Sequence, residues 1–272
     1  MRMVALVENT DCDARCGAEH GLCIYVKTKR HTLLMDTGQT DLLLRNAAAL
    51  GLSLTDVDTV ILSHGHYDHT GGLLPLVRVC PDADVYLRRC AVEPHFNGER
   101  YIGIDERILS LPRLTFTDGD LRLDDELFLF GDYGEKHDRP FANRTLTVER
   151  GGVRLPDDFE HEQSLVITQG GKRWLLSGCA HSGILNILER FREIFGCAPD
   201  YAVSGFHLMK RDGAYTEDEQ SAILQTAKAL SRLPTVFYTG HCTGEAAFDL
   251  MKNVMGVQLI ALHSGCEIRE AL

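Results

Sequence analysis

The sequence lacks any apolar run near the ~18 residues that a membrane span requires. Its first residues, MRMVALVENTDC, hold no apolar stretch of signal-peptide length. The nine cysteines are odd in number and scattered, which argues against a disulfide framework and for a reducing compartment. We therefore expect a cytoplasmic protein with no membrane partner.

Common cofactor motifs are absent as well. There is no Walker A, G-x-G-x-x-G or G-x-S-x-G motif, which disfavours nucleotide cofactors. The formal net charge of −11 disfavours nucleic-acid binding and suits a protein that collects divalent cations. Repeats, low-complexity tracts and Pro- or Ser-rich linkers are also missing, so we expect residues 1–272 to form a single domain. The oligomeric state is left open by these features.

Strand and helix patterns alternate along the chain and predict a layered α/β architecture. Residues 88–160 are less regular, and we interpret that stretch as an insertion over the site. Predicted strands cover 22–26, 32–35, 59–63, 84–87, 114–116, 127–130, 164–168, 173–177, 201–204, 236–239 and 257–262. Predicted helices cover 41–50, 183–195, 216–230 and 244–255, and another opens at GGLLPLV.

The motif HGHYDH at residues 64–69 is the strongest chemical signal. It follows the predicted buried strand 59–63, at the strand end where α/β folds place their sites. Neutral imidazole and carboxylate are ligands that suit Zn²⁺, Mn²⁺ and Fe²⁺. Residues two apart in an extended segment point the same way, so His64 and His66 can hold one metal. Asp68 and His69 lie past the bend and can hold a second, and we expect Asp68 to be catalytic.

Later strand ends offer the remaining ligands. In the segments GCAH, GFHL and GHCTG a strand and a glycine precede a histidine. We expect His181 and His241 to bind metal, and His207 and Cys179 to contact substrate or orient ligands. Direct ligation by His207, Cys179 or His161 stays open.

One aspartate and three cysteines in the first part of the chain are further candidates for a metal site. Asp36, in LLMDTG, is expected to hydrogen-bond the outer nitrogen of a metal-bound histidine. Cys12, Cys16 and Cys23 match no zinc-knuckle spacing, so we expect no small metal site there.

HGHYDHTGGL resembles the H-x-H-x-D-H signature of the metallo-β-lactamase superfamily. The resemblance implies a four-layer αββα sandwich with a dinuclear site. It implies one ion on His64, His66 and His181, and another on Asp68, His69 and His241. Zn²⁺ is the expected metal, with Mn²⁺, Fe²⁺ or Mg²⁺ as alternatives.

Nearly the whole chain resembles a narrower group, typified by the archaeal dihydropterin synthase of methanopterin biosynthesis. The similar segments are AEHGLCIYV, LLMDTGQTDLLLRNAAALGL, SHGHYDHTGGL, EQSLVI, SGCAHSGILNI, GFHL and GHCTGEAA. The group usually has an acidic residue where this chain has His161.

Three functions follow as hypotheses. The first is a metal-dependent hydrolase or transferase that acts on a phosphorylated, pterin-like small molecule. Gly-rich turns with Lys210 and Arg211 are candidates for binding its phosphate. The second is a hydrolase of carboxylic esters, lactones or thioesters. The third is a metal-dependent sensor or binding protein without catalysis.

Overall fold

Strand β1 (Arg2–Val7) shows why the protein is layered. Successive side chains of a strand point to opposite faces of the sheet, and here both faces are buried. Met3 and Ala5 face a core between two sheets, whereas Val4 and Leu6 face a core beneath helices. A strand that is apolar on both faces needs a covering layer on each side.

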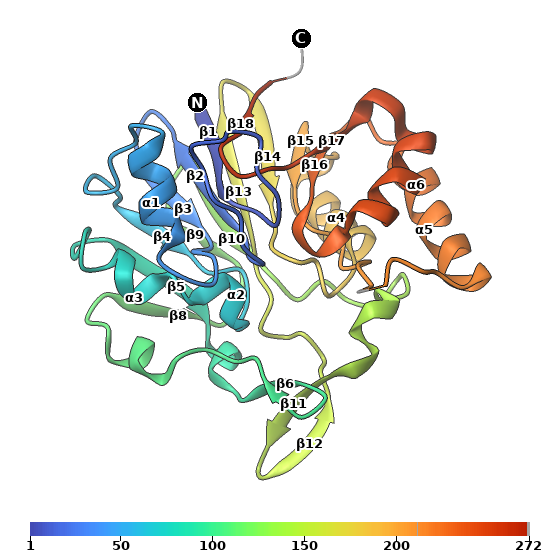
Figure 1. Cartoon of the computed structure of the whole chain (residues 1–272), viewed down its shortest axis with the longest axis horizontal. Helices are drawn as coiled ribbons and strands as arrows, with labels where there is room; N and C mark the ends of the chain where they lie inside the picture. Colours follow the sequence, from blue (N-terminus) through green and yellow to red (C-terminus); the bar gives the residue numbers. More distant parts are fainter. Residues whose placement is uncertain (211, 271–272) are drawn as a thin grey trace.

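The computed structural model describes residues 1–210 and 212–270, and its first sheet lies on the left of Figure 1. This sheet has the order β18-β1-β2-β3-β4-β5-β8, and β3, β4, β5 and β8 run parallel. Its outer face packs on the helices of the first half. The strands are Glu267–Ile268, Arg2–Val7, Cys23–Lys27, Thr32–Met35, Thr59–Ile61, Asp84–Arg88 and Leu114–Thr117. The helices are α1 (Leu42–Ala49), α2 (Tyr67–Thr70) and α3 (Leu73–Leu76).

The second sheet has the order β17-β16-β15-β14-β13-β10-β9, with β14 to β17 parallel. Its strands are Leu259–Ala261, Val236–Thr239, Tyr201–Val203, Lys172–Leu176, Ser164–Gln169, Leu127–Phe130 and Leu121–Arg122. Three helices cover its outer face on the right of Figure 1: α4 (Ile184–Phe195), α5 (Glu217–Leu230) and α6 (Glu245–Met255). The expected αββα sandwich is thus confirmed.

A third, four-stranded sheet projects from the sandwich at the bottom of Figure 1, in the order β12-β11-β6-β7. Its strands are Val153–Pro156, Leu146–Arg150, His95–Asn97 and Arg100–Tyr101. The stretch 88–160, which we interpreted as one insertion, is therefore divided. β8 and β10 belong to the two main sheets, and the third sheet forms the appended part. Short 3-10 helices are η1 (Arg89–Val92), η2 (Glu106–Ser110), η3 (Phe141–Thr145), η4 (His241–Thr243) and η5 (Gly256–Gln258).

Local sequence signals account for the helix ends. Thr216 caps α5 and forms a capping box with Glu219, which satisfies backbone donors of the first turn. Gly196 adopts a left-handed conformation at the end of α4. Among the described residues, no helix is both long and apolar enough to cross a bilayer.

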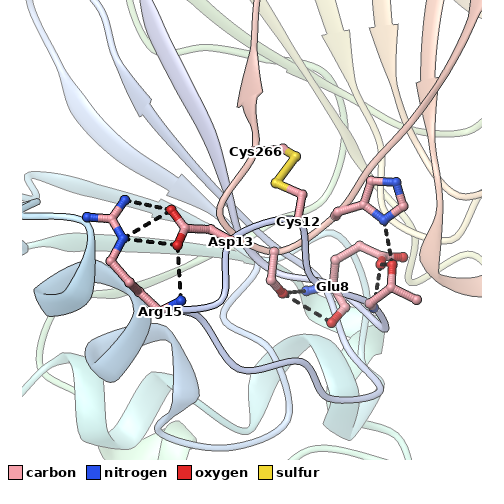
Figure 2. Close-up of a disulfide and its surroundings, with 8 residues drawn as sticks. Glu8, Cys12, Asp13, Arg15 and Cys266 are labelled. Atoms are coloured by element: carbon pink, nitrogen blue, oxygen red, sulfur yellow. Dashed lines mark hydrogen bonds and ion pairs between the residues drawn. A yellow bond between two sulfur atoms is a disulfide. The ribbon is translucent and has the colours of Figure 1, made fainter.

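The cysteines form no framework of several disulfides among the described residues, but one pair is bonded. Cys12 and Cys266, 254 residues apart, form a disulfide beside the loop that carries Glu8 (Figure 2). Antiparallel pairing of β1 with β18 brings the two ends of the chain together. A contact over such a separation leaves no spacing motif in the sequence. The other seven cysteines are free thiols.

Candidate metal centre

The parallel strands of both sheets direct their carboxyl ends to one region. Asp36 follows β3, and the HGHYDH motif follows β4. In the second sheet His181 follows β14, and His241 follows β16. Carboxyl ends of parallel strands meet at one edge of a sheet, so segments far apart in sequence supply one site.

Three imidazoles at this edge present unpaired nitrogens. His64, His66 and His181 are almost fully buried, and their ring centroids lie 4.5 to 5.0 Å apart. Nε2 of each has no hydrogen-bond partner within the described part of the chain. Burial lowers the pKa of all three well below its ordinary value, because it disfavours the charged ring. Neutral imidazoles with unpaired nitrogens fit a divalent transition metal, and we call these residues the imidazole set.

Hydrogen bonds fix the tautomer of two members of this set. His64 Nδ1 lies 2.8 Å from Ser63 Oγ, which itself donates to Asp36. Ser63 Oγ therefore accepts from His64 Nδ1. His181 Nδ1 donates to Asn143 Oδ1 at 3.0 Å, while Asn143 Nδ2 donates back to the His181 carbonyl. With the proton on Nδ1, the Nε2 lone pair is free to bind an ion.

A second group, which we call the mixed set, consists of Asp68, His69 and His241. The Nε2 atoms of His69 and His241 are 3.1 Å apart, and they lie 3.8 and 3.3 Å from Asp68 Oδ2. His241 Nδ1 donates to Asn9 Oδ1 at 2.9 Å, so its Nε2 faces Asp68 and His69. Burial opposes ionisation of Asp68, but neighbouring imidazoles, His69 foremost, hold the pKa of its carboxyl well below the usual range. The mixed set therefore offers one negative charge and two imidazoles.

Asp36 connects the two sets. Its Oδ2 lies 2.7 Å from His69 Nδ1 and also accepts from the Ser63 hydroxyl, which holds His64. Its Oδ1 accepts the Ser63 backbone N–H at 2.7 Å. Burial opposes protonation of His69, but Asp36 and Asp68 together raise its pKa. The Asp36 carboxylate therefore contacts a ring nitrogen of His69, as expected for a histidine near this strand end, and metal binding by that histidine stays a prediction.

Tight backbone geometry brings the two sheets close at the site. A Cβ on Gly178 would lie 2.1 Å from Ser63 Oγ and 3.1 Å from His64 Nδ1, so only glycine fits there. Asp36, Ala180, His207 and His241 all have positive φ. Strained backbone of this kind is concentrated at functional sites.

His161 contacts the backbone of the HGHYDH motif. Its Nδ1 accepts the Gly65 N–H at 3.0 Å, which places the proton of the neutral ring on Nε2. That Nε2 lies 3.4 Å from Asp157 Oδ2, which also contacts His95 Nδ1 at 2.9 Å. Burial and the nearby His95 lower the pKa of His161. His161 therefore holds the peptide between His64 and His66, and with His66, His95 and Asp157 it forms a further group of side chains that could hold an ion.

A cavity of about 810 Å³ opens onto both sets, and His66, Asp68, His181 and His241 line it. Cys179 and His207 line it too. Cys179 Sγ lies 3.1 Å from His69 Nε2, and the His207 ring centroid lies 4.0 Å from that of His181. Burial raises the pKa of the Cys179 thiol well above its ordinary value. Cys179 therefore contacts His69, and His207 lies beside His181.

Lys210, a candidate for phosphate binding, pairs with a carboxylate in the structure. Its Nζ is 2.9 Å from Glu219, the residue of the α5 capping box, and it lies outside the cavity lining. Arg211 lies outside the described residues.

The residues that hold His181 and His241 in place were not predicted from the sequence. The Glu8 carboxylate accepts the His241 backbone N–H, and Asn9 accepts from the His241 ring. Both follow β1, so the rule of polar residues after a strand would have found them had β1 been recognised. Asn143 lies in η3, and nothing in the local sequence indicates its contact with His181.

Comparison with known proteins agrees with this geometry. Residues 16–241 match the model of the metallo-beta-lactamase superfamily. The 7,8-dihydropterin-6-methyl-4-(beta-D-ribofuranosyl)-aminobenzene-5'-phosphate synthase of Methanocaldococcus jannaschii is 28% identical over 269 residues, covering 91% of this chain and 89% of that protein.

Solved structures show the same fold. A metal-dependent hydrolase of the beta-lactamase superfamily superposes with a TM-score of 0.85 and 32% identity, over 100% of this chain and 99% of that one. Zn²⁺-bound PqqB from Methylobacterium extorquens gives a TM-score of 0.61 at 13% identity, over 99% of this chain and 100% of that one. The chain therefore belongs to the metallo-β-lactamase superfamily of metal-dependent enzymes.

Proposed function

We propose that this protein is a hydrolase or transferase that uses two divalent ions, Zn²⁺ foremost, on a phosphorylated small molecule with a pterin-like ring. Mn²⁺, Fe²⁺ and Mg²⁺ are alternative metals. The observation that carries the proposal is the convergence of two ligand sets. In the imidazole set, three buried Nε2 atoms have no partner among the described residues. Leaving them so would cost about 1–3 kcal/mol each, and a bound ion removes that cost.

The two sets would hold one ion each. When bound, the ions would supply Lewis acidity and an activated water to a substrate in the cavity. Asp36, Ser63, Asn9 and Asn143 contact the Nδ1 atoms of these histidines and would keep the Nε2 atoms directed at bound ions. The protein's own contribution is this fixed orientation of ligands.

Asp68 and His20 provide a route for protons. His20 Nε2 lies 3.2 Å from Asp68 Oδ2, and the His20 side chain is 42% exposed. His20 also lines the cavity, so it can carry a proton between the Asp68 carboxylate and bulk water. This gives Asp68 its proposed catalytic role beside its role as ligand.

Two observations support a phosphorylated substrate. The synthase relative makes a compound whose name includes a 5'-phosphate, and the alignment spans 91% of this chain. The cavity wall also carries an arginine, Arg100, described below. We propose a small-molecule substrate and no nucleic-acid or membrane partner. We also propose a cytoplasmic location, because seven of the cysteines are free thiols.

Zinc-loaded protein should be assayed against phosphodiesters, phosphomonoesters and lactones, with the exposed His137→Ala variant as control. Turnover of a phosphate ester, or release of a bound pterin on denaturation, would support the proposal. Turnover of lactones alone would favour a carboxylic ester, lactone or thioester hydrolase. Full metal occupancy without any turnover would favour a sensor.

A further inference from the structure

The third sheet contributes a cation to the wall of the metal cavity. Arg100, in β7, lines the same cavity as His66 and Asp68. Its guanidinium carbon lies 4.8 Å from the ring centroid of Tyr67, the residue between those two ligands. The ring faces a guanidinium at a distance typical of a cation–π contact, which places Arg100 next to the metal motif.

Arg100 differs from the other arginines of the third sheet. Arg150 pairs with Glu93 and Asp158, and Arg154 pairs with Glu99. Within the described residues, no carboxylate lies within 4.0 Å of the Arg100 guanidinium. It is also the sole Lys or Arg of the described cavity lining. In a chain of net charge −11, an arginine left without an acidic partner beside the site is available to an anion.

A second donor faces the same cavity. Asn97 is the direct cross-strand partner of Arg100 in the β6–β7 hairpin, and it also lines the cavity. Side chains at directly opposed positions lie on one face of a sheet, with Cβ atoms about 4.5–5.5 Å apart. Asn97 Oδ1 accepts from the Thr145 hydroxyl at 2.8 Å, which leaves its Nδ2 group to donate. The hairpin thus presents a guanidinium and an amide N–H₂ side by side.

We propose that Arg100 and Asn97 form a subsite for a phosphoryl group of the substrate that is remote from the bond transformed at the metals. Planar guanidinium donors match phosphate oxygens in a bidentate manner, and an amide supplies a further donor. The assignment of this subsite to the substrate rests on the proposed function. The subsite makes the appended third sheet a specificity element, because the sheet holds the substrate's tail while the sandwich holds the ions.

The test measures how much a second phosphate adds to binding. Isothermal titration of zinc-loaded protein would compare 1,6-hexanediol bisphosphate, 6-hydroxyhexyl phosphate and 6-phosphonooxyhexanoate. The flexible six-carbon chain is chosen so that one phosphate can contact the metals while the other end contacts Arg100 in the same cavity. Contacts of the first phosphate with the ions are shared by all three probes and cancel in the ratio. We expect the wild type to bind the bisphosphate about 10-fold tighter than the hydroxyl probe, as for one added charge-assisted contact.

Three variants make the result specific. Arg100→Met should reduce the ratio to below about twofold, and Arg100→Lys, which keeps charge but loses the planar fork, should give an intermediate ratio. Arg232→Met, at an exposed arginine just after the end of α5 that does not line the cavity, should keep the wild-type ratio. An unchanged ratio in Arg100→Met, or no gain in the wild type, would overturn the subsite.

The remaining outcomes separate the subsite from the catalytic proposal. An equal gain from the carboxylate probe would overturn the phosphoryl assignment. An Arg100-dependent gain in a protein that turns over no ester would support the subsite while the proposed catalysis fails. Ester turnover with no Arg100-dependent gain would support the proposed catalysis and overturn the subsite.

Discussion

The imidazole set and the mixed set are neighbours built on different chemistry. The imidazole set has three neutral rings whose Nδ1 partners, where fixed, are a hydroxyl and an amide. The mixed set contains the Asp68 carboxylate, and a second carboxylate, Asp36, contacts His69. An ion in the mixed set would thus be held by charge as well as by lone pairs. The two positions should therefore be separable by mutation.

The largest effect is expected from removing one ligand of either set. His181→Ala should lose the ion of the imidazole set, and Asp68→Ala the ion of the mixed set, with one zinc left in each variant. Loss of several kcal/mol of transition-state stabilisation by an ion corresponds to about 1000-fold or more in rate. Zinc content by plasma mass spectrometry and phosphodiesterase rate would measure both. His66→Ala should behave like His181→Ala. Two zincs and full activity in any of these variants would contradict the assignment.

Asp36→Asn should weaken both sets together. Asparagine tolerates the φ of 62° at this position, so the backbone is kept while the charge is removed. Loss of such a ligand-orienting contact lowers metal affinity by about 10–100-fold. Competition with a zinc chelator, read as two binding steps, would measure it. A change confined to one step would show that Asp36 does not link the sets.

Asn143→Ala and Asn9→Ala form a matched pair of variants, each of which should weaken metal binding at only one of the two sets. Asn143 holds His181, so its loss should weaken only the imidazole set, again by about 10-fold or more. Asn9 holds His241, so its loss should weaken only the mixed set. The same chelator titration applies, with the exposed Asn253→Ala as control. Equal weakening of both binding steps by either variant would contradict the separation of the site into two independent sets.

The smallest effect concerns the contact between the two sheets at His31. His31, in the β2–β3 turn, lies 2.8 Å from Asp124, in the β9–β10 turn. Burial opposes protonation of His31, but Asp124 and Asp58 raise its pKa above the ordinary value. A raised histidine pKa stabilises the fold fully below the unfolded pKa, and the stabilisation is lost as pH rises through the folded pKa.

His31→Gln should therefore lower the free energy of unfolding by about 0.5–1 kcal/mol at pH 6 and by less at pH 9. Urea unfolding at both pH values would measure the difference. An equal loss at the two pH values would mean that the charge of His31 is not involved.

Sequence could predict the sandwich and the motif because both rest on local patterns. His64 to His69 lie within six residues after a buried strand, and His181 and His241 share the strand–Gly–His pattern. The residues that orient these ligands have no such pattern. Asn143 reaches His181 from a 3-10 helix in the stretch 88–160, and Asn9 reaches His241 across 232 residues. Only the pairing of strands brings them together.

The stretch 88–160 and the Cys12–Cys266 disulfide show the same limit. β8 and β10 read as isolated strands in sequence, yet each completes a main sheet by pairing with a distant partner. Cys12 and Cys266 pair because β1 and β18 are neighbours. Local propensity cannot encode such contacts, because their partners are set by topology.

The most direct test is anomalous X-ray scattering at the zinc edge from crystals of zinc-loaded protein. We predict two peaks in each chain, one against Nε2 of His64, His66 and His181, and one against Asp68, His69 and His241. A folded chain with no zinc at the three Nε2 atoms of the imidazole set would contradict the account.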